Sequence, residues 1–355
     1  MGSLGHRWAI VGLGGLSCGV GALSWMMAPT SSIHDTAVSA APQIRVLPRV
    51  TPSSASVQPI ARPAPRLSPS DRKIFNQLRS RASAENWINL PIGTLTQRVG
   101  ESFLGSEYQA NLLDRTSLNA LGNTSGNTSG NISSQEALTA SLQQFDCVLF
   151  VETALALAQM VQQPDLTDSQ AETLFFNVLQ QYRYRNGTLD DYCSRLHYFS
   201  DWILDHDRRG LVQEMGRSLG GVPLERSLSF MSQNWGKYPV LVASPMLRTC
   251  ITETEAAIDT KNVFYLPTQQ ISQHYSRLQP GDVVGVVTRM KNLDVTHSGL
   301  VYQRLDANGA VRSAKTGLLH ASVRSGIKIS SDLATYVAGV DGAIGIVVAR
   351  PLPLK

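Results

Sequence analysis

This chain of 355 residues has only four cysteines and seven histidines, and their spacing excludes the usual metal sites. The sequence contains no Cys-x-x-Cys and no His-x-x-x-His pattern. Zinc sites in proteins are commonly built on such spacings. We therefore expect no metal ion and no other cofactor.

Charge is also scarce. Only 16% of the residues are charged, the formal net charge is +4, and no block of Lys and Arg with interleaved aromatic residues occurs. This pattern excludes nucleic acid as an expected partner. The hydrophobic share of 43% is enough for the core of one large domain or two small ones.

The N-terminus differs from the rest of the chain. Arg7 precedes an apolar stretch over residues 8–28 that is about as long as a membrane span. Residues 1–28 are therefore predicted to be a signal peptide, with small residues at 38–40 for cleavage, or a retained membrane anchor. Cys18 lacks the aliphatic residue three positions before it that a lipoprotein signal requires, which disfavours lipidation.

Two segments have compositions that cannot form a core. Residues 29–70 are rich in Pro, Ser and Ala and are predicted to be a linker. Residues 121–134 repeat Gly-Asn-Thr-Ser and are predicted to be a flexible surface loop. The folded domain is expected to span residues 71–355.

Within this domain, helical patterns come first and alternating patterns follow. Helices are expected over segments that share helical spacing of apolar residues: 73–78, 95–104, 147–158, 167–183 and 192–207. Strands are expected over segments in which apolar and polar residues alternate or apolar runs are short: 282–288, 295–303, 311–321, 326–330 and 343–349. Asp306-Ala-Asn-Gly309 predicts a hairpin turn. This order predicts an α+β fold with an antiparallel sheet.

One cysteine and two histidines suggest a catalytic group. Cys147 begins an expected helix, where the helix dipole favours a thiolate. His297 and His320 lie in expected strands, where rigid backbone can hold an imidazole beside a sulfur. Each residue taken singly is more often part of a core, but the order Cys, His, His is typical of a cysteine hydrolase.

The motifs around these residues resemble the NlpC/P60 superfamily, in particular its DUF1460 branch of N-acetylmuramoyl-L-alanine amidase-like proteins. The motifs that match the superfamily are Phe145-Asp-Cys147, Pro280-Gly-Asp282, His297-Ser-Gly-Leu-Val and His320-Ala-Ser322. The run Ser194-Arg-Leu-His-Tyr-Phe-Ser-Asp-Trp202 matches the branch and is the most specific of them. The resemblance covers about residues 90 to 350.

This resemblance implies a papain-like fold, with the nucleophile at the start of a helix packed on the sheet and a helical insertion before the base. It makes Cys147 the nucleophile, His297 the general base and His320 the group that orients His297. It also places Tyr108 near the oxyanion, although the usual Gly-x-Pro-Tyr reads Gly-Ser-Glu-Tyr108 here.

The interval between nucleophile and base is long, at 150 residues. An insertion of this kind is expected to wall the cleft, and five of its residues are candidates for substrate binding: Arg195, His197, Tyr198, Asp201 and Trp202. Arg195 is suited to grip a carboxylate, and the two aromatic rings are suited to stack on a sugar or peptide. The alternative is that this run is only the apolar stripe of a helix.

The implied function is a monomeric cell-envelope amidase that cleaves the N-acetylmuramoyl-L-alanine bond of peptidoglycan or muropeptides through a thioester. A γ-D-glutamyl peptidase and a catalytically silent muropeptide-binding module remain alternatives. In an exported protein Cys193 and Cys250 can form a disulfide, although their separation in sequence does not decide it.

Overall fold

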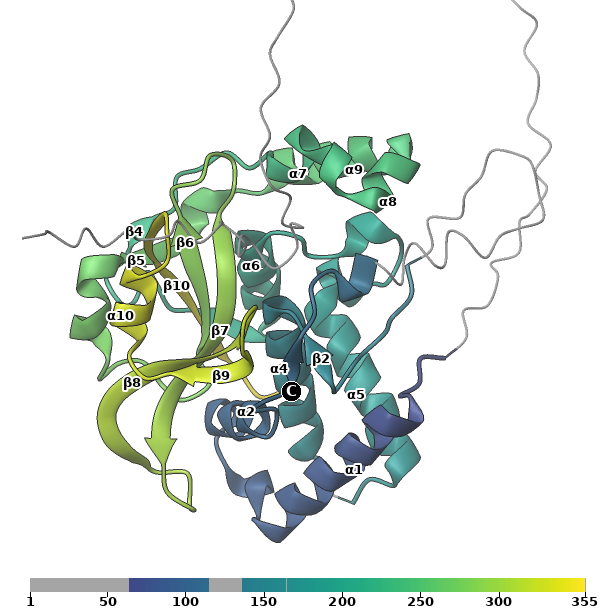
Figure 1. Ribbon diagram of the computed structural model, residues 1–355, viewed down its shortest axis with the longest axis vertical. Coiled ribbons are helices and arrows are strands. Elements are labelled where there is room, and N and C mark those ends of the chain that lie inside the picture. The colour runs from purple at the N-terminus through teal and green to yellow at the C-terminus, as the bar shows by residue number, and fades with distance from the viewer. Residues whose placement is uncertain (1–63, 115–135, 164, 355) are drawn as a thin grey trace, which may run out of the picture. The chain divides into compact units, whose positions relative to one another are not determined.

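The computed structural model describes residues 64–114, 136–163 and 165–354 (Figure 1). The expected signal or anchor, nearly all of the expected linker and the repeat at 121–134 lie outside these ranges. Within the described ranges, the helices are too short or too polar to serve as membrane spans.

Within the described ranges, the C-terminal half contributes every strand of an eight-stranded antiparallel sheet, as the alternating sequence predicts. Its strands run in the order β4-β5-β10-β6-β7-β8-β9, and β3 also pairs with β10. The bounds are β3 Val212–Glu214, β4 Val222–Pro223, β5 Phe264–Pro267, β6 Val283–Thr288, β7 Val295–Leu305, β8 Val311–Ser322, β9 Gly326–Ser330 and β10 Ala343–Pro351. Each expected strand is present.

The predicted hairpin turn joins β7 to β8. The Asp306 carboxylate accepts hydrogen bonds from the backbone N–H groups of Asn308 and Ala310. Gly309 has φ of +81°, in the left-handed region that glycine adopts without strain. The turn chemistry therefore fixes the register of two strands that carry site residues.

Helices cover the sheet on both faces. Their bounds are α1 Pro69–Ala84, α2 Ile92–Glu101, α4 Cys147–Val161, α5 Asp168–Arg183, α6 Phe199–Arg209, α7 Phe230–Gln233, α8 Pro239–Ala243, α9 Pro245–Ala257 and α10 Leu333–Ala338. Figure 1 shows α4 between the sheet and α5, with α2 beside it. The opposite face of the sheet packs on α10 and the 3₁₀ helix Thr268–His274.

The buried character of α4 follows from its sequence. Nearly every side chain from Leu149 to Met160 is buried, because the helix contacts β7 and β8 on one side and α2 and α5 on the other. A helix that is apolar on most of its surface is suited to such a central place. The N-terminus of α4 is therefore held rigidly against the sheet.

One expected helix is broken. The sequence predicts a helix over residues 192–207, but the chain forms a 3₁₀ turn at Tyr192–Ser194, an extended stretch, and then α6 from Phe199. Asp191 caps the short turn by accepting from the N–H groups of Cys193 and Ser194. Arg195 then pairs with Tyr184 in an isolated β-bridge, so the backbone there is extended and the expected helix is interrupted.

Candidate active site

Cys147 is the first residue of α4, and the preceding aspartate fixes its backbone. The Asp146 carboxylate accepts hydrogen bonds from the N–H groups of Val148 and Leu149, at 3.1 and 2.9 Å. This N-cap satisfies two of the donors that a helix leaves unpaired in its first turn. Cys147 itself is fully buried. The predicted position of this cysteine at a helix N-terminus is confirmed.

The sulfur of Cys147 is disulfide-bonded in the structure. None of the cysteines in the described ranges is a free thiol. The nucleophilic form of a cysteine is its thiolate. Any nucleophilic role of Cys147 therefore belongs to the reduced protein.

Strand β7 lies against the start of α4 and carries His297. Ser298 Oγ donates a hydrogen bond of 3.1 Å to the carbonyl oxygen of Cys147. Cys147 and His297 both line one cavity, and Asp146 and Ser298 line it with them. Residues that are 150 positions apart in the sequence thus meet at one site.

His320 lies on the neighbouring strand and is hydrogen-bonded to His297. His297 Nε2 and His320 Nδ1 are 2.8 Å apart, and His320 Nε2 is 3.0 Å from Oγ of Ser330 on β9. The ring of Tyr336 in α10 lies 6.0 Å from the His297 ring and 4.6 Å from the His320 ring. The adjacent strands β7, β8 and β9 therefore hold His297, His320 and Ser330 in a hydrogen-bonded chain. The Tyr336 ring packs against both imidazoles.

Sequence reasoning missed Ser330 and Tyr336. Ser330 reaches His320 through the register of β8 and β9, which places Leu318 opposite Ser330 and His320 opposite Lys328. The predicted hairpin order of these strands is the only signal that points toward Ser330.

Burial keeps both imidazoles neutral at ordinary pH. It lowers the pKa of His297 to about 4. The pKa of His320 is lowered to about 3, by burial first and then by His297 and Lys328. A neutral imidazole has one nitrogen able to accept a proton, as a general base requires.

Tyr108 lies next to the nucleophile segment. Strands β1 Glu107–Tyr108 and β2 Gln144–Phe145 pair in parallel, with Tyr108 opposite Phe145. Burial, and then the Asp146 carboxylate, raise the pKa of Tyr108 to about 12, so its hydroxyl keeps its proton. Tyr108 is not one of the described residues that line the cavity.

Four of the five predicted substrate-binding residues do line this cavity: Arg195, His197, Tyr198 and Trp202. The fifth, Asp201, is not among the described lining residues. Its carboxylate accepts from both terminal nitrogens of Arg185, at 2.6 Å each. This bidentate pair engages the Asp201 carboxylate inside the protein, and its expected role at the substrate stays a prediction.

Arg195 lines the cavity but is already engaged by protein carboxylates. Its Nε donates to Glu136 at 2.5 Å, its Nη1 to Asp114 at 2.8 Å, and its Nη2 to the carbonyl oxygen of Leu113 at 3.2 Å. A substrate carboxylate would have to displace one of these partners. The contacts thus favour a role in fixing the cavity wall.

The aromatic candidates are packed inside the wall. The ring of Trp202 stacks on Phe199, with centroids 5.4 Å apart, and on Tyr182, at 6.2 Å. Tyr198 OH donates to Glu255 and accepts from the N–H of Met231. With Trp202 and Tyr198 each only 2% exposed, neither ring offers an open face for stacking.

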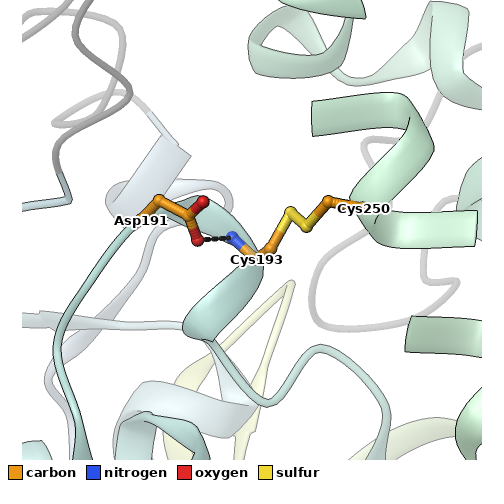
Figure 2. Close-up of side chains that lie close together, drawn as sticks. All are labelled: Asp191, Cys193 and Cys250. Carbon is orange, nitrogen blue, oxygen red and sulfur yellow. Dashed lines mark hydrogen bonds between the residues drawn. A yellow bond between two sulfur atoms is a disulfide. The ribbon is translucent and has the colours of Figure 1, made fainter. Parts of the chain in front are cut away.

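A disulfide between Cys193 and Cys250 joins two parts of the insertion, the wall at Arg195 and the helix α9. It connects the 3₁₀ turn Tyr192–Ser194 to α9, with a Cα–Cα distance of 6.3 Å. Figure 2 shows the bond, with the Asp191 carboxylate accepting from the Cys193 N–H. The three side chains also lie within metal-ligand distance of one another, but the disulfide removes both thiolates from such a role.

Comparison with solved structures gives several similar chains. An N-acetylmuramoyl-L-alanine amidase from Bacteroides uniformis is 27% identical, with a TM-score of 0.58, and the match covers 74% of this chain and 99% of that one. A putative xylanase from Bacteroides fragilis is 28% identical, with a TM-score of 0.55 and coverage of 71% and 99%.

A third structure shows similarity of the fold alone. It is a Legionella pneumophila protein assigned to DUF1460, 18% identical, with a TM-score of 0.52 and coverage of 81% and 94%. No curated protein matches the sequence.

A family model described as AmiA-like, N-acetylmuramoyl-L-alanine amidase-like, matches residues 98–344. This range includes the start of α4, the whole insertion and the strands that carry both histidines. The chain therefore belongs to the AmiA-like family of N-acetylmuramoyl-L-alanine amidase-like proteins.

Proposed function

We propose that this protein is a cysteine amidase that hydrolyses the bond between N-acetylmuramic acid and L-alanine in peptidoglycan or muropeptides. The observation that carries the proposal is the meeting of Cys147 and His297 at one cavity, with His320 hydrogen-bonded to His297. Family membership supports the substrate class. We also propose that the domain has the papain-like fold of the NlpC/P60 superfamily, because its nucleophile candidate begins a helix packed on an antiparallel sheet.

The first step uses the reduced form of Cys147. Because Nε2 of His297 faces His320, Nδ1 is the atom that takes the proton from the Cys147 thiol. The thiolate then attacks the carbonyl carbon of the muramoyl lactyl group, and the carbonyl oxygen becomes an oxyanion. The backbone N–H of Cys147, at the positive end of α4, is placed to stabilise this charge.

The second step releases the amine. The His297 imidazolium gives its proton to the nitrogen of L-alanine, the C–N bond breaks, and a thioester to Cys147 forms. Water then attacks the thioester, with His297 taking its proton, and the Cys147 thiol is restored. The lowered pKa of His297 suits this role, because the base must start each cycle without a proton.

Two neighbours assist without taking part in bond changes. His320 holds the orientation of His297, and Ser330 in turn holds His320. Tyr108, which keeps its proton, is a candidate second donor to the oxyanion. A His in the orienting position adds no negative charge, unlike the carboxylate of a serine protease triad.

Mass spectrometry of digested muropeptides tests the proposal. The purified full chain is incubated with a muropeptide, with and without a thiol reductant, beside a Cys147→Ala control. Release of an intact stem peptide that begins with L-alanine is expected from the reduced wild type only. Release of a peptide that begins with the third stem residue, with L-alanyl-D-glutamate left on the sugar, would instead identify a γ-D-glutamyl peptidase, and no release would end the hydrolase proposal.

The substrate sets the proposed location. Peptidoglycan lies outside the cytoplasmic membrane, so this function places the domain in the cell envelope. Whether residues 8–28 are cleaved or retained as an anchor is answered by sequencing the N-terminus of the mature protein. An N-terminus near residue 41 would indicate cleavage at the predicted small residues.

A further inference from the structure

Three polar atoms at the cavity have no partner. Arg183, Tyr238 and Thr296 all line the cavity that holds Cys147 and His297. The atoms Arg183 Nη2, Tyr238 OH and Thr296 Oγ1 are buried and have no hydrogen-bond partner within the described ranges. The three residues are only 2%, 2% and 4% exposed.

Most other charged groups of the cavity are paired within the protein. Asp146 accepts from two N–H groups of α4, and Asp294 accepts from the N–H groups of Ser200 and Val295. Arg195 is held by Glu136 and Asp114. The three unpartnered atoms therefore differ from these charged groups, which have partners within the protein.

Such atoms are costly. Leaving a buried donor or acceptor without a partner costs about 1 to 3 kcal/mol, so native proteins keep few of them. Three in one cavity, beside the candidate nucleophile and base, indicate that the missing partners belong to a ligand. A ligand would supply them only while it is bound.

Arg183 shows which atom is left for a ligand. It is the last residue of α5, its Nε donates to Glu152 at 2.9 Å, and its Nη1 donates to the carbonyl oxygen of Thr139 at 2.6 Å. These two bonds fix the plane of the guanidinium and leave Nη2 unused. A rigid guanidinium with one unused edge is well suited to an anionic oxygen.

Thr296 and Tyr238 come from two other parts of the fold. Thr296 precedes His297 at a bulge in the β6–β7 pairing, where the register shifts between Val286 and Val287. Bulges of this kind re-aim side chains next to active sites. Tyr238 directly precedes α8, so it belongs to the helical insertion.

We infer that Arg183, Tyr238 and Thr296 form a subsite for the peptide part of the substrate, in which Arg183 Nη2 binds a carboxylate and the two hydroxyls bind peptide polar groups. This inference rests on the proposed function. It moves the recognition of the carboxylate from Arg195, whose nitrogens all have protein partners, to Arg183.

Removing each hydroxyl separates a ligand contact from a structural one. Tyr238→Phe and Thr296→Val delete one oxygen each and keep the shape of the side chain. A buried hydroxyl without a partner contributes nothing favourable to folding, so the melting temperature is expected to stay equal or rise. Affinity for substrate is expected to fall by roughly 2-fold to 10-fold for each variant, the loss of one neutral hydrogen bond.

The chain offers a matched control. Thr268 Oγ1 is also buried without a partner in the described ranges, but it lies in the 3₁₀ helix Thr268–His274 and does not line the cavity. Thr268→Val is expected to change the melting temperature in the same direction as Thr296→Val. Its affinity for substrate is expected to equal that of the parent.

Binding is measured by calorimetry on full-length Cys147→Ala, so that no turnover interferes. The probes are N-acetylmuramoyl-L-alanyl-D-glutamate with its γ-carboxylate converted to an amide, and the same molecule with its α-carboxylate converted to an amide as well. A charge-assisted bond to Arg183 predicts binding of the acid roughly 10-fold to 100-fold more tightly than the amide.

Each outcome decides the inference. Unchanged affinity in both hydroxyl variants would overturn the subsite, as would a marked fall in their melting temperatures, because that would reveal protein partners. Equal binding of acid and amide would overturn the role of Arg183. If wild type binds in the expected pattern but releases no product, the proposed reaction fails and the subsite stands.

Discussion

The cavity has one wall of strands and one of helices, and the two walls hold their buried polar side chains differently. On the strand side, His297, His320 and Ser330 form a chain of neutral groups. On the helical side, buried arginines and carboxylates form ion pairs, such as Arg183 with Glu152 and Arg195 with Glu136. One wall carries groups that can exchange protons, and the other carries charges that compensate each other.

Because of this difference, we expect a substitution on one wall to affect the reaction and a substitution on the other to affect stability. A neutral imidazole is inexpensive to bury, so its loss affects the reaction more than the fold. Removing one member of a buried ion pair leaves an uncompensated charge and costs about 3 to 5 kcal/mol. Substitutions of the strand-wall imidazoles should therefore change rates, and substitutions that break an ion pair of the helical wall should change stability.

Cys147→Ala is expected to have the largest effect. It removes the proposed nucleophile, so turnover of muropeptides should fall by about six orders of magnitude. The melting temperature of the reduced protein should change little, because a small buried side chain is replaced by a slightly smaller one. Equal activity of variant and wild type, measured under reducing conditions, would contradict the cysteine mechanism.

The next largest effect is expected on the strand wall. His297→Ala removes the proposed base and should lower kcat/KM by about 10² to 10⁴. His320→Ala should keep partial activity, because water can replace an orienting group in part. Both variants should fold, as thermal melts would check. If His320→Ala were as inactive as His297→Ala, the role of base would have to be exchanged or shared.

Arg195→Lys tests the helical wall. A lysine amine keeps the charge but cannot bind Glu136 and Asp114 in the fork geometry of arginine, so the loss of a charge-assisted hydrogen bond should lower the free energy of unfolding by about 1.5 to 3 kcal/mol. The KM of the folded fraction should stay unchanged.

The control is Arg208→Lys. Arg208 pairs with Asp205, but its side chain is 64% exposed, so the stability change should be within about 0.5 kcal/mol. A large rise in KM for Arg195→Lys with normal stability would return Arg195 to the substrate.

The smallest effect concerns pH. His297 has a pKa of about 4 in the folded protein, below the usual value for histidine, so the base stays neutral until the solution is quite acidic. The acid limb of kcat/KM is therefore expected near pH 4 rather than near 6.5. The same shift means that stability falls as pH drops from about 6.5 toward 4, because the unfolded chain binds the proton first.

Asp146 also titrates and lies beside Cys147, so its effect on pH dependence has to be separated from that of His297. Burial raises its pKa to about 7, so its titration contributes to stability with the opposite sign: stability falls as pH rises from about 4 toward 7. Asp146→Asn keeps an N-cap for α4 and removes this titration. An acid limb that moves in Asp146→Asn would assign the limb to Asp146 instead of His297.

The strand wall was largely predictable from the sequence. Alternating residues and the turn Asp306-Ala-Asn-Gly309 predict β7 and β8, and these strands place His297 and His320 side by side. The aspartate before Cys147 and the apolar run after it predict the start of α4. In each case the sequence pattern lies within a few residues of the strand, turn or helix end that it predicts.

The helical wall was not predictable to the same degree. Arg195 meets Glu136 and Asp114, which lie 59 and 81 positions away, and no periodic pattern links them. The turn that breaks the expected helix depends on the Asp191 cap and on pairing with Tyr184, which is a tertiary contact. Unpartnered atoms such as Tyr238 OH leave no mark in sequence, because they are defined by what their surroundings lack.

The disulfide that joins Cys193 to Cys250 sets a further condition on the proposed enzyme. It closes a loop of 57 positions within the insertion, so it holds the cavity wall in place. The proposed nucleophile has the opposite requirement, since Cys147 acts only as a thiol. A reductant strong enough to open the Cys193–Cys250 bond would therefore loosen the wall while it leaves Cys147 in its active thiol form.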